Sequence, residues 1–532
     1  MKTWTNLLDR IGRYRLAAVL VASVLTLHFF VPRLQPNEAG KLVYSRQLLD
    51  PSFLNRDWIQ AREAGDNALA APFALVMAPL WLVFKNATAV ALAGRAIVCF
   101  ALLFALVRLA RALDIGWLAF AAGLIAWVHF GQRLGAGEWV FEGVEAKCIA
   151  YAFLVLALTG ILNQQFAIAG VFSGLAILFH SAVGGWGAIA LGGALSLRLR
   201  KDGLRRLIQF CGPVVAFSLP VALVTMGYMR AEGPPAGLLD TNQLIVLFRN
   251  PHHIDPNYFG GWREIAVAAF MACVTAIGLR QITTPYKTAS VASFLLMLLG
   301  EFGAGLIARR CGWLWFLKAY PFRVADVMAP LLFWLVLPGF GAAVVNGLLK
   351  RFDLPVRRKA WLTIGLVCAI ALAIPEIHAL GRFARIWSEH ARSSGDAWGD
   401  MTHWIRDHTP RSAIFIAPPW EDAFWLEAER AEVVNFKHAP NNDRIQEWYT
   451  RLVAVNGAPF RSVGFRALNE LRQHYAALDR RQLENIRNAY GADYYLTTSQ
   501  RPDLSPAPAH CNGAYFLYDL HTAGRDGPHT GE

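Results

Sequence analysis

Residues 88–108 read TAVALAGRAIVCFALLFALVR, and only Arg95 and the final Arg108 in this run are charged. A helix of about 20 apolar residues is long enough to cross the hydrocarbon core of a bilayer. An isolated strand cannot do so, because its backbone polar groups would have no partners in lipid. The run therefore predicts a transmembrane helix, and it sets the class of the whole chain.

Comparable apolar runs recur through residues 1–379. They lie near 16–32, 88–108, 115–131, 147–162, 166–181, 183–198, 207–227, 264–280, 289–307, 323–345 and 360–379. Of the 532 residues, 55% are hydrophobic and 17% are charged, whereas soluble proteins average about 25% charged residues. This composition excludes a water-soluble enzyme and a disordered chain. We predict a mainly α, polytopic membrane bundle with about 11 spans.

The orientation follows from the basic loops. Clusters of Lys and Arg at 108–111, 198–206 and 350–359 fall on one side of the membrane in a single consistent scheme, and such clusters mark the cytoplasmic side. We predict a cytoplasmic N-terminus in a bacterial inner membrane, with the chain after the last span in the periplasm. The apolar stretch 68–85 then belongs to the first outer loop, about 33–87. The alternative is that this stretch crosses the membrane and the N-terminus lies outside.

Residues 380–532 differ in composition from the rest. They carry 17 basic and 19 acidic residues, against 34 and 19 in residues 1–379. The basic excess thus belongs to the membrane part, where it sets orientation, and we predict no nucleic-acid partner. Expected strands lie at 413–417, 432–436, 493–497 and 514–518, and expected helices lie at 396–408, 443–455 and 466–489.

This pattern predicts a small periplasmic α/β domain over 380–521, followed by a flexible tail at 522–532. The domain has no GxGxxG, P-loop or GxSxG motif. The simplest interpretation is therefore a lid or docking domain.

The first outer loop contains two acidic candidates, Asp50 and Asp57. They are seven residues apart and would share one face of a helix. A carboxylate at the membrane surface can act as general base toward a hydroxyl nucleophile. The alternative is an interfacial loop with a helix cap at Asp50 and an aromatic anchor at Trp58.

The second outer loop carries Glu138, Glu142 and Glu145, spaced i, i+4 and i+7. On a helix they would form one acidic face, and mutual repulsion would require a basic partner such as Lys147 or Arg133. Unpaired charge so close to the bilayer is costly, which favours substrate binding over a simply solvated face. The solvated face is the alternative.

The later outer loops carry predicted donors to phosphate or sugar hydroxyls. In the third loop these are Arg249, His252 and His253. Adjacent histidines seldom point the same way, so no metal site is predicted. In the fourth segment, Arg309, Arg310 and Arg323 are basic residues on the outer side and require an anionic partner. A specific lipid phosphate is the preferred partner, and ordinary anionic headgroups are the alternative.

Five ionisable residues lie within the expected spans. They are Arg95, His129, His180, Glu301 and Asp326. Such residues usually have functional roles. Their shared depth predicts a polar cavity open to the outer side, in which Arg95 could pair with Glu301.

The acidic first loop, the Glu-bearing second loop, the basic outer segment and the terminal outer domain together resemble the GT-C class of integral membrane glycosyltransferases. The resemblance implies transfer of a sugar from a polyprenyl-phosphate donor to a periplasmic acceptor, with Asp57 or Asp50 as base. No cofactor is predicted, although a divalent cation is compatible with the class. The oligomeric state is left open.

The chain departs from the class in two places. The first outer loop has no adjacent Asp-Asp, Asp-Glu or Asp-x-Asp, and Tyr490-Gly-Ala-Asp-Tyr494 is not a WWDYG motif. Both departures argue against an oligosaccharyltransferase. Two non-enzymatic alternatives remain: a transporter of lipid-linked glycan or a small solute, and a structural partner in envelope assembly.

Overall fold

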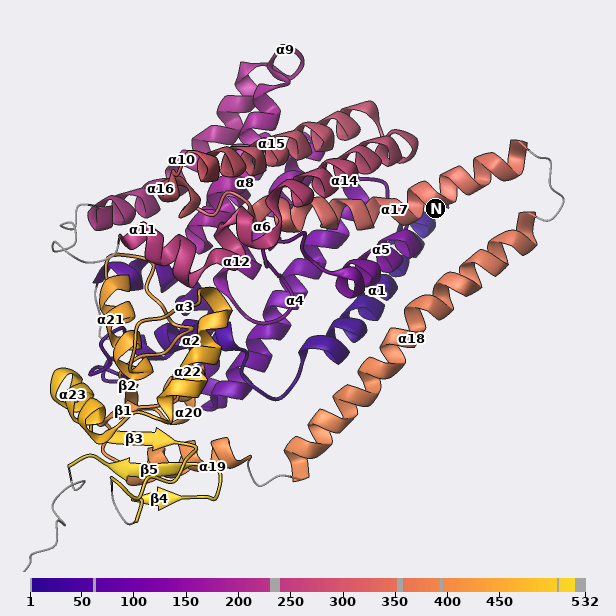
Figure 1. Ribbon diagram of the computed structural model, residues 1–532. Coiled ribbons are helices and arrows are strands. Elements are labelled where there is room, and N and C mark those ends of the chain that lie inside the picture. The colour runs from indigo at the N-terminus through magenta and orange to yellow at the C-terminus, as the bar shows by residue number, and fades with distance from the viewer. Residues whose placement is uncertain are drawn as a thin grey trace, which may run out of the picture. The chain divides into compact units, whose positions relative to one another are not determined.

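The computed structural model describes residues 2–60, 64–229, 240–351, 357–392, 396–504 and 507–521. The chain is mostly helical and contains a five-stranded sheet (Figure 1). It divides into two compact units. The helical unit comprises Met1–Val31, Arg95–Leu223 and His252–Ile386. The mixed unit comprises Pro32–Gly94, Val224–Pro251 and Trp387–Glu532.

Each apolar run expected to span the membrane coincides with a helix. These helices are α1 (Lys2–Phe29), α4 (Ala87–Ala112), α5 (Trp117–Phe130), α6 (Ala146–Leu162), α7 (Phe166–Phe179), α8 (Ser181–Ser196), α10 (Leu204–Met229), α14 (Gly261–Ile282), α15 (Pro285–Arg310), α17 (Arg323–Arg351) and α18 (Arg357–Arg392). Five helical segments among the described residues are long and apolar enough to cross a membrane. They are Ala87–Ala112, Leu204–Val224, Gly261–Ile282, Pro285–Arg310 and Arg323–Leu348.

Short elements connect these helices. They are α9 (Leu199–Asp202), α12 (Pro251–Ile254), α13 (Pro256–Phe259) and α16 (Leu314–Leu317). Within the helical unit, α6 is buried on nearly every side, as expected of a helix that is apolar all round.

Close approach between helices of this unit depends on glycine. A Cβ added at Gly123 of α5 would clash with the Trp334 carbonyl of α17, and one at Gly170 of α7 would clash with the Phe210 carbonyl of α10. Small residues at helix contacts allow backbones to pack closely where lipid supplies no hydrophobic drive.

The mixed unit joins the first outer loop to the C-terminal segment. Its helices are α2 (Pro36–Gln47), α3 (Ala64–Phe84), α11 (Thr241–Gln243), η1 (Leu244–Arg249), α19 (Ala397–His408), α20 (Phe424–Glu427), α21 (Ile445–Asn456), η2 (Gly464–Arg466), α22 (Ala467–Tyr475) and α23 (Arg480–Tyr490). Because Asp479 caps α23 through the Gln482 amide, the single helix expected over 466–489 is wrong and two helices form instead.

The sheet has the order β2-β1-β3-β5-β4. Its strands are β1 (Ile414–Ile416), β2 (Ala431–Glu432), β3 (Tyr494–Thr497), β4 (His510–Cys511) and β5 (Phe516–Asp519). β1 pairs in parallel with both β2 and β3, whereas β5 is antiparallel to β3 and β4. All four expected strands form, although β2 is much shorter than 432–436, and β4 was not expected. The predicted tail at 522–532 lies outside the described residues.

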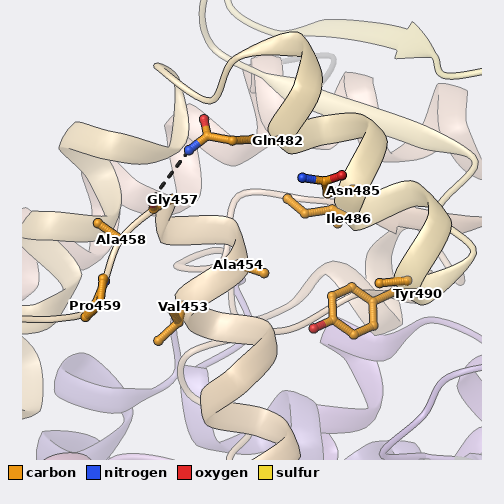
Figure 2. A pocket seen from close by; sticks show the side chains of 10 residues that line it. Val453, Ala454, Gly457, Ala458, Pro459, Gln482, Asn485, Ile486 and Tyr490 are labelled. Atoms are coloured by element: carbon orange, nitrogen blue, oxygen red, sulfur yellow. Dashed lines mark hydrogen bonds between the residues drawn. The ribbon is translucent and has the colours of Figure 1, made fainter.

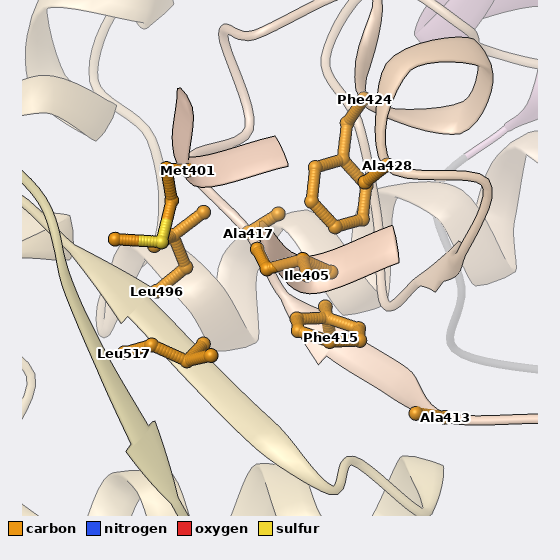
Figure 3. Close-up of a cluster of buried hydrophobic side chains, with 9 residues drawn as sticks. All are labelled: Met401, Ile405, Ala413, Phe415, Ala417, Phe424, Ala428, Leu496 and Leu517. Atoms are coloured by element: carbon orange, nitrogen blue, oxygen red, sulfur yellow. The ribbon is translucent and has the colours of Figure 1, made fainter. Parts of the chain in front are cut away.

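One apolar cluster holds α19 against this sheet (Figure 3). Met401 and Ile405 of α19 meet Phe415 of β1, Leu496 of β3 and Leu517 of β5, and all five are fully buried. Burial of this kind contributes about 1.5–3 kcal/mol per large side chain. The cluster fixes the central parallel strands, and with them the segments that leave their carboxyl ends.

Candidate functional site

In the helical unit, the segment between α5 and α6 is shaped by Asp326, in the first turn of α17. Its Oδ1 accepts hydrogen bonds from the amides of Leu134, Gly135 and Ala136 at 2.7–3.0 Å, and its Oδ2 accepts one from the Glu138 amide at 3.0 Å. The backbone of residues 131–145 forms bends and extended segments around this carboxylate instead of a helix. The expected helical face of Glu138, Glu142 and Glu145 is therefore wrong, and α6 begins only at Ala146.

The same segment nevertheless brings predicted site residues together. Glu138 lies 3.0 Å from Lys147 Nζ through Oε1 and 2.8 Å from Arg323 Nε through Oε2, and Lys147 is 3.7 Å from Glu145. Burial alone would raise the pKa of Glu138, but Arg323 and Lys147 more than offset it and hold that pKa below its usual range. Glu142 is half-buried and forms no ion pair with the described residues.

The other predicted donors in this unit also have partners within the chain or remain on the surface. Arg309 forms an ion pair with Asp255, with Nε 2.8 Å from Oδ1. His253 Nδ1 lies 2.6 Å from the Ala136 carbonyl oxygen, and the His252 ring packs beside it. Arg310 is exposed. The buried charges around Glu138 are balanced, so this network has no excess positive charge to attract a phosphate.

The expected pairing of Arg95 with Glu301 is wrong. Arg95 donates to the carbonyl oxygens of Phe29 and Val31 at 3.1 and 2.9 Å. Both carboxylate oxygens of Glu301 are buried, and neither has a hydrogen-bond partner among the described residues. Arg95 thus satisfies the carbonyls where α1 ends, which is a structural role.

In the mixed unit, Asp57 is a buried anchor. Its Oδ1 accepts from the Ile59 and Gln60 amides, each at 3.0 Å. Its Oδ2 accepts from Trp425 Nε1 at 2.9 Å and from the Glu432 amide at 3.1 Å. Burial nonetheless raises the pKa of Asp57 above its usual value. Its side chain is 1% exposed, so a substrate hydroxyl cannot reach it in this conformation.

Asp50 has a local role instead. It accepts hydrogen bonds from the Ser52 hydroxyl and, at 3.0 Å, from the Ser52 amide. The hydroxyl bond holds the pKa of Asp50 below its usual value. Residues 51–60 form turns rather than a helix, so Asp50 and Asp57 do not share a helical face.

The mixed unit contains an acidic pair that sequence reasoning missed. Glu421 and Asp422 follow β1, and Lys437 follows β2, so they leave the carboxyl ends of neighbouring parallel strands. Since β2 and β3 flank β1 on opposite sides, the strand order reverses here, and open α/β sheets place ligands at such points. The overlooked signal was an acidic pair directly after a predicted buried strand.

Both members of this pair are half-buried and titrate near neutrality. Burial raises the pKa of Glu421 to about 7, and the neighbouring Asp422 adds to the effect. Burial raises the pKa of Asp422 to about 6, although Lys437, Arg249 and Arg472 face it and oppose the rise. The Asp422 carboxylate accepts no hydrogen bond from the residues that the structure describes. A partly buried carboxylate with a shifted pKa and cations nearby is a candidate for the chemistry of a functional site.

His438 holds the backbone at Asp422. Its Nε2 lies 2.7 Å from the Asp422 carbonyl oxygen, and its ring stacks on Trp425 with centroids 4.5 Å apart. Burial lowers the pKa of His438 to about 3, so its ring is neutral at physiological pH and can donate from Nε2. Because Trp425 also donates to Asp57, the first outer loop supports the same segment.

A separate surface pocket of about 400 Å³ lies between α21 and α23 (Figure 2). Its walls include Val453, Ala454, Ile486 and Tyr490, and Gln482 closes one end by donating to the Gly457 carbonyl at 3.4 Å. Tyr490 is the only titratable residue of its lining. Apart from the Tyr490 hydroxyl, the lining offers no acid–base group, and it contains no cation to bind a phosphate.

Comparison with known proteins leaves the family open. A family model described as a domain of unknown function, DUF6798, matches residues 396–455, which include Glu421, Asp422 and Lys437. No curated protein matches. The archaeal oligosaccharyltransferase AglB from Archaeoglobus fulgidus, solved with an inhibitory peptide and a dolichol-phosphate, is 12% identical with a TM-score of 0.47, covering 93% of this chain and 70% of that one.

The apo form of the Archaeoglobus fulgidus oligosaccharyltransferase is also 12% identical. Its TM-score is 0.46, and the match covers 92% of this chain and 69% of that one. Likenesses this weak assign neither a fold family nor an activity.

Proposed function

We propose that this protein is a membrane glycosyltransferase that moves a sugar from a polyprenyl-phosphate donor to a hydroxyl acceptor, with Asp422 as general base. One observation carries the proposal. Asp422 is a half-buried carboxylate with a pKa of about 6 that faces three cations, Lys437, Arg249 and Arg472. Transfer from a phosphate-linked donor requires a base and cations close to it.

The proposed reaction is a single displacement. Asp422 takes the proton of the acceptor hydroxyl as the acceptor oxygen attacks the anomeric carbon. The bond between that carbon and the donor phosphate oxygen breaks, and its electron pair leaves with the lipid phosphate. Lys437, Arg249 and Arg472 stabilise the charge that develops on the leaving group. The stereochemistry at the anomeric carbon inverts.

Donor binding would strengthen the base. The three cations lower the pKa of Asp422, and a bound phosphate neutralises part of their field. The pKa of Asp422 should then rise toward the pH of the medium, where a general base is most effective. Glu421, with a pKa of about 7, remains partly protonated and can donate to a sugar hydroxyl.

The remaining residues support this centre. Arg249 is held by a 2.7 Å bond to the Lys437 carbonyl and lies over the Phe436 ring. Asp57 acts through Trp425 as a positioning residue instead of as the base. In the helical unit, Arg310 is exposed, whereas Arg309 and Arg323 bind carboxylates of the protein.

The test compares Asp422→Asn with Asp407→Asn, since Asp407 is an exposed carboxylate of the same domain. Purified protein in nanodiscs is given a panel of polyprenyl-phosphate hexoses and pentoses with a membrane extract as acceptor. Loss of general-base catalysis typically costs about 10²–10⁴-fold. We expect Asp422→Asn to lose transfer to this extent while it still binds polyprenyl phosphate, and Asp407→Asn to match the wild type. Equal transfer by the two variants would remove Asp422 from the mechanism.

A further inference from the structure

Three side chains that no role above explains converge in the helical unit. His28 lies in the last turn of α1, His129 in the last turn of α5, and Glu376 follows Pro375 in α18. His129 Nε2 is 2.6 Å from Glu376 Oε1, and His28 Nε2 is 3.3 Å from Glu376 Oε2. One ligand atom from each residue lies within 4.8 Å of the others.

We propose that these residues bind a divalent transition metal, with Zn²⁺ the best match. Two imidazoles and one carboxylate form a ligand set typical of Zn²⁺, which binds them at about 2.0–2.2 Å and leaves a fourth position for water. Ligand atoms on a tetrahedral Zn²⁺ of that radius are about 3.3 Å apart. His28 Nε2 already lies 3.3 Å from Glu376 Oε2. His129 Nε2 lies 2.6 Å from the other oxygen, Oε1, so this pair needs to open by about 0.7 Å and the carboxylate needs to turn one oxygen toward the ion.

Two buried polar atoms of this cluster support a bound metal rather than a plain ion pair. His28 Nε2 and Glu376 Oε2 are buried atoms that lie 3.3 Å from each other, and neither makes a well-aligned hydrogen bond within the described part of the chain. Buried polar atoms without a hydrogen bond are destabilising, so an ordinary ion pair would be expected to form well-aligned hydrogen bonds at both atoms. A cation between them would satisfy both at once.

The predicted topology is consistent with this site. The apolar runs around His28, His129 and Glu376 would all pass from the inner to the outer side, and each residue lies near the outer end of its run. The three ligands would therefore share one depth at the membrane boundary, where an ion can enter from water. The metal would clamp α18, the long orange helix of Figure 1, to α1 and α5.

The experiment uses the full-length protein in nanodiscs with Zn²⁺ alone as the probe. We expect about one Zn²⁺ per chain to bind. Co²⁺ in its place should give the visible ligand-field absorption of a tetrahedral site. The Co²⁺ spectrum of the wild type needs no variant, so it is informative even if a variant fails to fold.

The variants then identify the ligands. Loss of a residue that only supports a metal ligand weakens metal binding by about 10–100-fold. His129→Ala and Glu376→Gln each remove a ligand, so we expect them to weaken Zn²⁺ binding by more than this. His378→Ala is the matched control, because His378 is an exposed histidine of the same helix, two residues from Glu376. Absence of saturable Zn²⁺ binding by the wild type, or equal loss in the His378 variant, would overturn the proposal. Neither readout depends on sugar transfer.

Discussion

Glu138 in the helical unit is buried and Asp422 in the mixed unit is half-buried, yet the pKa values of these two acids move in opposite directions. Glu138 contacts two cations, at 2.8 and 3.0 Å, and its pKa falls. Asp422 only faces its cations, and its pKa rises to about 6. Direct pairing with cations keeps a carboxylate charged and leaves it no free position to bind a substrate. A carboxylate that is buried but not paired keeps a proton equilibrium near neutrality, which catalysis can use.

The largest expected effect comes from breaking the paired site. Arg323→Met leaves Glu138 buried beside Lys147 alone, and removal of one member of a buried pair costs about 3–5 kcal/mol. We expect the free energy of unfolding in detergent to fall by about this amount. Arg310→Met is the control, since Arg310 is exposed and only thirteen residues away. Similar stability of the two variants would show that the pairing around Glu138 contributes little.

The unpaired site should respond in the opposite sense. Because the pKa of Asp422 in the folded protein lies above the ordinary 3.8, the folded state binds more protons than the unfolded state between about pH 4 and 6, and stability falls as pH rises through this window. Asp422→Asn removes this penalty. We expect the variant to be more stable than the wild type at pH 8 by about 2 kcal/mol and nearly equal at pH 4. Chemical unfolding at the two pH values measures the difference. Greater stabilisation at pH 4 would contradict the sign.

A smaller effect probes the cations around Asp422. Lys437 lowers the pKa of this carboxyl, so Lys437→Met should raise it. A base must be deprotonated to act, and kcat/KM for transfer by the wild type, which reports the protein without donor, should therefore rise with pH through about 6 and then level off. In the variant the midpoint should move to higher pH by up to about one unit. Arg480→Met, at an exposed residue of α23, should leave the profile unchanged. A midpoint shifted to lower pH would show that Lys437 does not lower the pKa of Asp422.

Local patterns predicted the elements of both units well. The apolar runs coincide with helices because composition along some twenty residues is enough to specify a membrane helix. Similarly, the run Ala413-Ile-Phe-Ile-Ala417, stopped by two prolines, forms β1. The predictions that were wrong concern features that depend on long-range contacts. Asp326 sets the conformation of residues 134–138 from 188–192 positions away, so the spacing of the glutamates suggested a helix that does not form.

The candidate site was hidden for the same reason. Asp57 has the residue type and loop position of a base, but Trp425, 368 positions later, covers it. Asp422 and Lys437 become neighbours only when β1 and β2 pair in parallel, and Arg249 joins them from a different part of the chain. Residue type could nominate acids and bases for both units. Only the sheet order and the burial distinguish the paired acid from the one left available.

The smallest expected effect tests whether the three glutamates between α5 and α6 act together, as their spacing suggested, or separately, as their contacts indicate. Spacing placed Glu138, Glu142 and Glu145 on one face, whereas only Glu138 and Glu145 share Lys147 as a partner. Glu142→Gln should therefore change the free energy of unfolding by no more than about 0.5 kcal/mol. Glu138→Gln leaves Arg323 and Lys147 without their shared counter-charge, so its loss should be several times larger. Equal losses would mean that the three glutamates act as one acidic surface after all, and that burial at Glu138 does not set it apart.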